Sequence, residues 1–134
     1  MSVRHWKATE WEQRLREVFR RIDEELEARY GARYPLHPAR SPRGTTASHE
    51  DDGLFDIGAV FTPGFGSQQG RGYLVEVRMA TLANVPADVV ERIERDVVER
   101  LRAELPKAFP NQNLRVERDG HHYKIIGGLA LGNA

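Results

Sequence analysis

The chain has 134 residues, 40% of them hydrophobic and 30% charged, and its 20 basic residues balance 20 acidic ones. It has no cysteine, which excludes disulfide scaffolds, thiolate metal sites, iron–sulfur clusters and a cysteine nucleophile. No apolar run approaches the roughly 18 residues of a membrane span, and residues 1–11 lack the features of a signal peptide. We therefore expect a single domain over residues 1–134, located in the cytoplasm, with no membrane partner.

The first predicted element is a helix that begins at Thr9. Thr9 and Glu12 form a capping box, in which a hydroxyl and a carboxylate satisfy amide groups at the start of a helix. Opposite charges four residues apart are typical of a solvated face, and Gly31 is expected to end the helix in the left-handed conformation. Apolar residues recur at steps of three and four, which places them in one stripe: Trp11, Leu15, Val18, Phe19, Ile22, Leu26 and Tyr30.

Two strands and a hairpin loop follow. Residues 54–62 and 73–80 alternate between apolar and polar side chains, which predicts strands with one face toward the core. Residues 63–72 between them include four glycines and predict a flexible hairpin loop. Its tip carries Phe65, an aromatic side chain suited to anchoring a partner.

A second helix is predicted between two prolines. Pro86 suits the first helical position, and Pro106 is expected to bound the helix at its other end. Its apolar stripe consists of Val89, Val90, Ile93, Val97, Leu101 and Leu105.

The last predicted element is a hairpin of residues 114–118 and 121–126. The intervening Asp119-Gly120 dipeptide is preferred in a two-residue type I′ turn. A turn at these two residues pairs Val116 with Tyr123 across the hairpin.

The order helix, strand, strand, helix, strand, strand predicts an α+β fold. Two helices with one apolar stripe each can cover one face of a four-stranded antiparallel sheet, which gives a two-layer sandwich. The other face of the sheet stays open and offers a surface for dimerisation or ligand binding.

The least regular part of the chain is residues 31–53. A connection of 23 residues without apolar periodicity is uncommon in a compact domain and is usually functional or disordered. Its charges are sorted, because no acidic residue occurs between Ala28 and Ser48, and three follow at positions 50–52. Guanidinium groups bind phosphate and carboxylate oxygens in a bidentate manner, so the segment is a candidate anion site. With one residue of the second loop, the candidates are Arg33, His37, Arg40, Arg43, His49 and Arg71.

The same arginines have an internal alternative. They can cap carbonyl groups at the end of the first helix or pair with the acidic residues at positions 50–52. Histidines and carboxylates are present in the chain, but no metal-binding motif with diagnostic spacing occurs. We predict no metal, no other cofactor and no catalytic residue.

These observations favour a small interaction protein without an evident catalytic motif. It would associate with itself through the open sheet or a helix, or bind another protein, with residues 31–53 and 63–72 forming its recognition edge. One alternative is an enzyme or ligand-binding domain for a small anion, held by Arg40 and Arg43, with His37 or His49 as acid or base. A second alternative is nucleic-acid binding, for which a net charge of zero is low.

Overall fold

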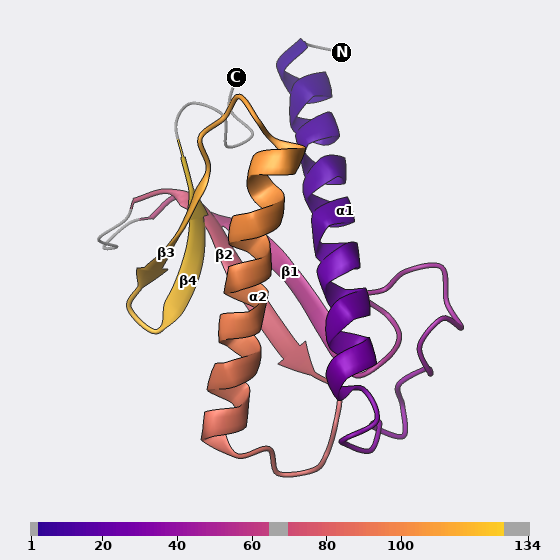
Figure 1. The fold of residues 1–134 in the computed structure, drawn as a ribbon. Coiled ribbons are helices and arrows are strands. Elements are labelled where there is room, and N and C mark those ends of the chain that lie inside the picture. The colour runs from indigo at the N-terminus through magenta and orange to yellow at the C-terminus, as the bar shows by residue number, and fades with distance from the viewer. Residues whose placement is uncertain (1–2, 65–69, 128–134) are drawn as a thin grey trace.

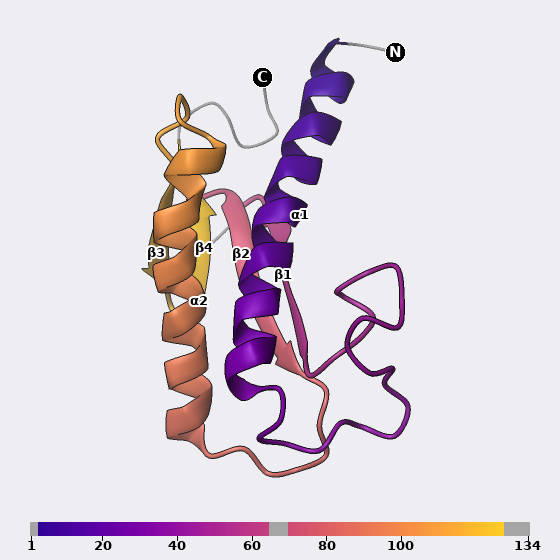
Figure 2. The same cartoon turned by 45° about the vertical axis from the view of Figure 1, so that its right-hand side comes forward.

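The computed structural model describes residues 3–64 and 70–127, with side chains from Glu10 onward (Figure 1). This part of the chain forms two helices and four strands: α1 (Val3–Tyr30), β1 (Phe55–Thr62), β2 (Gly72–Met79), α2 (Ala87–Ala108), β3 (Arg115–Asp119) and β4 (His122–Ile126). The strands make one antiparallel sheet in the order β1-β2-β4-β3. Both helices lie on the same face of this sheet (Figures 1 and 2). The predicted two-layer α+β sandwich is confirmed.

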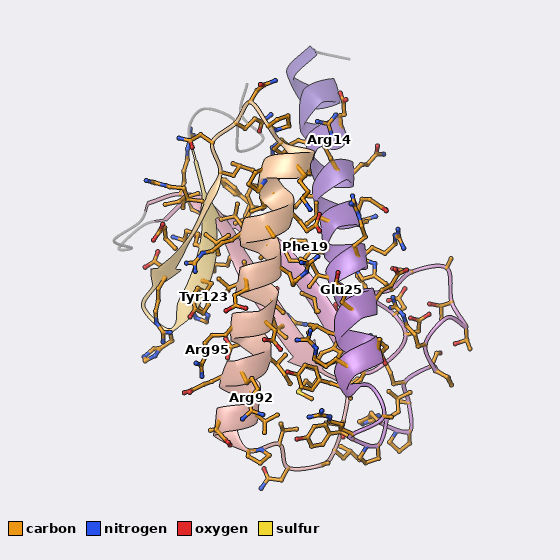
Figure 3. All side chains as sticks on the ribbon, viewed as in Figure 1. Arg14, Phe19, Glu25, Arg92, Arg95 and Tyr123 are labelled. Carbon is orange, nitrogen blue, oxygen red and sulfur yellow. The ribbon has the colours of Figure 1, made fainter. Side chains whose placement is uncertain are left out.

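The predicted apolar stripes form most of the core. All seven stripe residues of α1 are buried, and so are four of the six predicted for α2: Ile93, Val97, Leu101 and Leu105. Val90 is exposed although it was predicted in the α2 stripe, and Phe109, which follows α2, is a buried residue that the prediction missed. Charged side chains such as Arg92 and Arg95 are exposed on α2 (Figure 3).

Both ends of α1 differ from the prediction. The helix begins at Val3 instead of Thr9, because residues 3–8 contain no glycine or proline that would stop it and a capping box permits a start without enforcing one. The helix ends at Tyr30, but Gly31 is not left-handed. Its amide still bonds the carbonyl of Glu27 (2.8 Å), so the last turn closes without the left-handed residue.

The prolines of α2 also lie at shifted positions. Pro86 precedes the first helical residue, Ala87, instead of occupying that position. Pro106 lies inside the last turn instead of bounding the helix, which continues to Ala108. Proline lacks an amide donor, but the amide of Phe109, three residues later, still bonds the carbonyl of Leu105 (2.8 Å), which closes the last turn.

The β3–β4 hairpin has a different register from the predicted one. Val116 lies opposite Ile125 instead of Tyr123, a shift of two residues along β4. The turn therefore consists of Gly120 and His121, one residue later than predicted. Gly120 has a φ of 65° and His121 has no positive φ. This combination fits a type II′ turn, which needs glycine at its first position, and not the predicted type I′ turn.

Candidate functional site

Arg40 holds the α1–β1 loop (residues 31–54) against the start of β1. Its Nε donates to the carbonyl of Gly53 (2.9 Å), and its Nη2 donates to the carbonyls of Asp52 and Phe55 (3.1 Å each). The loop also forms a parallel bridge between Ser41 and Asp52. A charged group with several internal acceptors fixes the backbone around it. The loop is therefore a structured part of the fold.

Arg43 lies between two buried carboxylates from distant parts of the chain. Its Nη1 is 3.5 Å from Oδ1 of Asp23, in α1, and 3.5 Å from Oδ1 of Asp52, in the loop. Both aspartates are buried, whereas Arg43 is partly exposed. This arginine therefore clamps the loop to α1.

The two aspartates titrate in opposite directions although they share Arg43. Asp52 accepts hydrogen bonds from the amides of Gly44 and Thr46 and from the Thr46 hydroxyl (2.9–3.1 Å). Burial favours a raised pKa for Asp52, but these bonds and Arg43 outweigh it and hold the pKa below its ordinary value. The oxygens of Asp23 have no hydrogen-bond partner among the described residues. Burial therefore raises the pKa of Asp23 to about 7, against the attraction of Arg43.

Glu27 holds the end of the loop, and His49 lies half-buried within it. Both carboxylate oxygens of Glu27 accept from the amide of Leu54 (2.9 and 3.1 Å). Burial lowers the pKa of His49, whose Nε2 is buried without a hydrogen-bond partner among the described residues.

The structure separates the predicted anion-site residues. Two of them, Arg40 and Arg43, belong to the network just described, and His49 lies half-buried in the same loop. Arg33 lies over the ring of Tyr30, 5.1 Å from its centroid, and the Nδ1 of His37 accepts from the amide of Ala39 (3.0 Å). Arg71 is exposed just before β2. Arg40 and Arg43 thus have the kind of internal acceptors that the sequence allowed as the alternative to an anion site.

The two predicted recognition loops lie at opposite ends of β1. An eight-residue strand is roughly 25 Å long, so residues 31–53 and the described ends of 63–72 flank an edge and do not make one compact site. Phe65, predicted as an anchor, lies outside the described residues.

The described residues also lack a metal cluster and a membrane-spanning helix. Among these residues, no group of three or more histidine, aspartate or glutamate side chains is placed to hold a metal ion. Neither of the helices described is long and apolar enough to cross a bilayer.

β1 is an edge strand, and one hydrogen bond fixes the direction of its backbone groups. The amide of Ala80 donates to the carbonyl of Leu54 (2.7 Å), which makes these residues a hydrogen-bonded pair. Hydrogen-bonded and non-hydrogen-bonded pairs alternate along an antiparallel ladder. The even-numbered residues of β1 therefore bond β2, and the odd-numbered residues direct their amide and carbonyl groups away from the sheet: Phe55, Ile57, Ala59 and Phe61.

The α1–β1 loop covers only the first half of this edge. Arg40 occupies the outward carbonyl of Phe55. The outward backbone groups of Ala59 and Phe61 have no hydrogen-bond partner within residues 3–64 and 70–127. The second half of the β1 edge is therefore open to another strand.

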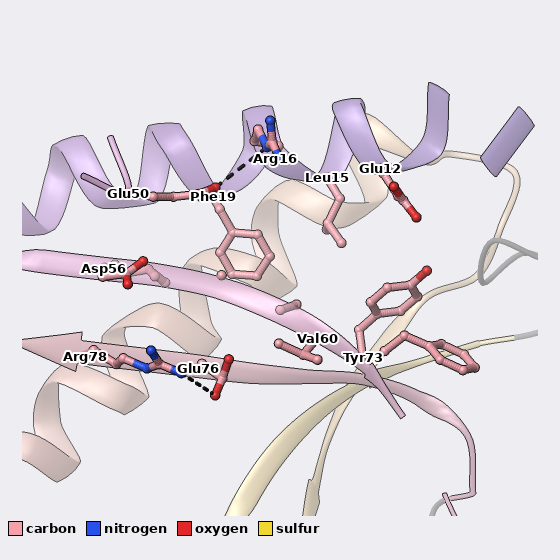
Figure 4. Close-up of a pocket in the computed structure, with 14 residues that line it drawn as sticks. Glu12, Leu15, Arg16, Phe19, Glu50, Asp56, Val60, Tyr73, Glu76 and Arg78 are labelled. Carbon is pink, nitrogen blue, oxygen red and sulfur yellow. Dashed lines mark hydrogen bonds and ion pairs between the residues drawn. The ribbon is translucent and has the colours of Figure 1, made fainter. Parts of the chain in front are cut away.

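A groove of about 480 Å³ runs along β1 beside α1 (Figure 4). Figure 4 shows Leu15 and Phe19 pointing from α1 toward β1, above Val60. Val60 and Phe61 are 52% and 49% exposed, which is high for large apolar side chains side by side on a strand. The apolar part of the lining is Leu15, Phe19, Ile57, Ala59, Val60, Phe61 and Tyr73, and the charged part is Glu12, Arg16, Glu50, Asp56, Glu76 and Arg78.

Stacked aromatic rings connect the groove to Trp11. The ring of Tyr73 lies edge-on to Phe61 (5.6 Å between centroids) and stacks on Trp11 (4.8 Å). Trp11 in turn contacts Phe109 (5.2 Å), and its Nε1 donates to Oε1 of Gln112 (2.9 Å). An occupant that moves Tyr73 will therefore change the surroundings of Trp11.

The opposite edge of the sheet is built differently. β3 has five residues, four of them charged, whereas β1 has eight residues with one charge, Asp56. β1 also has no proline and pairs with β2 through eight consecutive residues without a bulge. Short strands, charges, prolines and bulges are the usual devices that keep sheet edges from pairing. The edge at β3 is protected, and the second half of the edge at β1 is available.

The sequence analysis missed Asp23 and Glu27, which anchor the loop from α1. On a helical projection at about 100° per residue, Asp23 lies only about 20° beyond Tyr30, the edge of the predicted stripe. An acidic residue at the margin of a buried stripe, facing a connection rich in arginine, is a signal that could have identified it. The open half of β1 had no comparable signal, because exposure of an edge depends on the strand order.

Comparisons with known proteins give a family without an assigned activity. A family model described as "Uncharacterised protein" matches residues 6–127, which include all four strands, α2 and all but the first three residues of α1. An uncharacterised protein of Borreliella burgdorferi is 39% identical over 121 residues, 90% of this chain and 94% of its own length. No solved structure matches the chain.

Proposed function

Since the chain belongs to this family of uncharacterised proteins, we propose from its structure that it is a small interaction protein that captures an extended protein segment along β1. The observation that carries this proposal is the open half of an apolar edge strand beside a groove. Strand addition at a free edge is a recurrent way to bind peptides, with main-chain hydrogen bonds for affinity and side-chain pockets for specificity.

The geometry provides both parts of such a site. Ala59 and Phe61 each offer an amide and a carbonyl to an incoming strand. Alternate side chains of that strand would enter the space beneath α1, where Leu15 and Phe19 form an apolar wall. The remaining side chains would lie on the other face of the sheet, beside Val60.

The engagement of the loop arginines supports this proposal over the two alternatives. The guanidinium groups of Arg40 and Arg43 are directed at carbonyls and buried carboxylates of the chain itself. An anion or a nucleic acid would have to compete with these internal partners. Binding of a small anion or of a nucleic acid stays a prediction from the sequence.

The test uses a short synthetic peptide of alternating valine and threonine with blocked ends. Trp11 serves as the reporter in a Trp6→Phe background, because it stacks on Tyr73 in the groove. We expect saturable binding, and we expect it to weaken at least about tenfold, or about 1.4 kcal/mol, when the amides on the side of the peptide that faces β1 are N-methylated.

Two variants with the same new charge test the location. Ala59→Lys places an ammonium group on the face of β1 beneath α1, and we expect it to abolish binding. Gly58→Lys places the same group on the other face, where an added side chain meets nothing within 4 Å, and we expect little effect. Equal binding of the methylated peptide, or full binding by Ala59→Lys, would contradict the proposed function.

A further inference from the structure

We infer that the segment captured by β1 is β1 of a second copy of the chain, paired about a two-fold axis through Val60. Two copies then share one eight-stranded antiparallel sheet, with all four helices on the same face. This inference rests on the proposed function of the β1 edge and specifies its partner.

The outward backbone groups fit this axis. An axis at Val60 places Ala59 of one copy opposite Phe61 of the other, and these residues have the outward amides and carbonyls left open. The two symmetric pairs form four main-chain hydrogen bonds. Ile57 then lies opposite Pro63, which has no amide to donate, so the hydrogen-bonded pairing centres on Ala59 and Phe61.

Neighbouring axes fit less well. An axis at Ala59 places Phe61 opposite Ile57, whose side chain is already fully buried within its own copy, so the half-exposed ring meets no small residue. An axis at Phe61 places Ala59 opposite Pro63, so that the open carbonyl of Ala59 receives no donor. An axis between two residues would place side chains of opposite faces against each other.

Side-chain sizes are complementary at the Val60 axis. On the helix face, the half-exposed ring of Phe61 meets the small Ala59 of the other copy twice. On the other face, the two exposed Val60 side chains meet each other, and Gly58, with open space around it, meets Thr62. The large apolar side chains that β1 leaves exposed are thereby covered.

The charges around the groove also permit a second copy. The groove is lined by both acidic and basic side chains, Glu12 and Arg16 among them, so each copy presents both signs of charge to the other. The formal net charge of zero leaves no long-range repulsion between copies.

A cysteine scan tests the axis, because the chain has no cysteine of its own. Directly opposite residues have Cα atoms about 4.5–5.5 Å apart, within the range of a disulfide, whereas residues offset by two are about 8–9 Å apart. We expect oxidation with diamide to link Val60→Cys to itself. Ala59→Cys and Phe61→Cys should each remain unlinked alone and should link when mixed. Arg115→Cys, exposed on the edge at β3, controls for random collisions and should remain unlinked.

Sedimentation of the full chain completes the test. We expect a dimer for the unmodified chain and for His121→Lys, which adds the same charge at an exposed position in the β3–β4 turn. We expect at least a tenfold higher dissociation constant for Ala59→Lys, with circular dichroism confirming that each variant folds. A chain that stays monomeric and unlinked but binds the valine–threonine peptide would overturn the second copy as partner and leave the proposed function standing. Loss of peptide binding as well would overturn both. Self-linking of Ala59→Cys or Phe61→Cys in place of Val60→Cys would overturn the axis.

Discussion

Replacing Asp23 with asparagine should stabilise the protein at neutral and alkaline pH. Asp23 is fully buried, and its carboxylate has no hydrogen-bond donor in the described part of the chain and only a shared contact with Arg43. The pKa of Asp23 is about 7 in the folded protein against an ordinary value of 3.8. This gap corresponds to roughly 4 kcal/mol, since each pKa unit is worth about 1.4 kcal/mol.

The direction of the pH dependence follows from where the proton is held. Between about pH 4 and pH 7 the unfolded chain releases the proton of Asp23 while the folded chain keeps it, so stability falls as pH rises. Above about pH 7 the carboxyl group ionises in the folded chain too, and the loss of folding stability stays constant. Asparagine resembles the protonated acid and does not titrate. The gain from Asp23→Asn should therefore be near zero at pH 4 and approach 4 kcal/mol at pH 8.

Urea unfolding followed by circular dichroism at pH 4, 5, 6, 7 and 8 measures this gain for each variant. Asp51→Asn removes an exposed carboxylate from the α1–β1 loop and controls for the change in net charge. A difference between Asp23→Asn and the unmodified chain that does not change with pH would refute the reasoning. So would a variant that is less stable at pH 8, because it would show that the ion pair with Arg43 outweighs burial.

Two further substitutions test how the loops are held. Arg40→Met should lower the unfolding free energy by about 2–4 kcal/mol, because three carbonyls lose a charged donor. Arg33→Met, at an exposed position, should have a much smaller effect in the same urea titration. Similar losses of stability for the two variants would argue against the anchoring role of Arg40. Gly64→Ala should destabilise by about 1–3 kcal/mol or more, because its φ is 81° and a Cβ would clash with the carbonyl group of Gly70. Gly44 has a similar φ of 84°, but a Cβ there would meet nothing within 4 Å, so Gly44→Ala should lose only the stability that the strained backbone costs. Equal melting temperatures for the two alanine variants would contradict the clash at Gly64.

The sequence predicted the layers of the fold because burial repeats with the period of each element. The α1 stripe and the alternation of β1 and β2 each have one arrangement that hides their apolar residues. The register of β3 and β4 could not be predicted in the same way. A shift of two residues keeps every side chain on its face, so the pattern is satisfied with Val116 opposite either Tyr123 or Ile125, and only the turn distinguishes the two.

The candidate site was less predictable because its contacts join distant parts of the chain. The sorting of charges in residues 31–53 correctly marked the segment as unusual, but it did not reveal which acceptors the arginines have. Asp23 lies 20 residues before Arg43 in the sequence, and their contact depends on the path of the whole loop. The contact of Arg40 with the carbonyl of Phe55 depends on which edge of β1 faces outward.

The two proposals together give a reason for the contrast between the edges of the sheet. An apolar eight-residue edge that is open along its whole length would be an aggregation hazard. Arg40 occupies the outward carbonyl of Phe55 at the beginning of this edge, and Pro63 offers no amide just beyond its end, which restricts a partner strand to the residues between them. A two-fold pairing uses the same surface on both copies and is therefore closed. The edges that remain outermost are the short, charged β3 strands, which resist further addition, so the assembly would end at two chains.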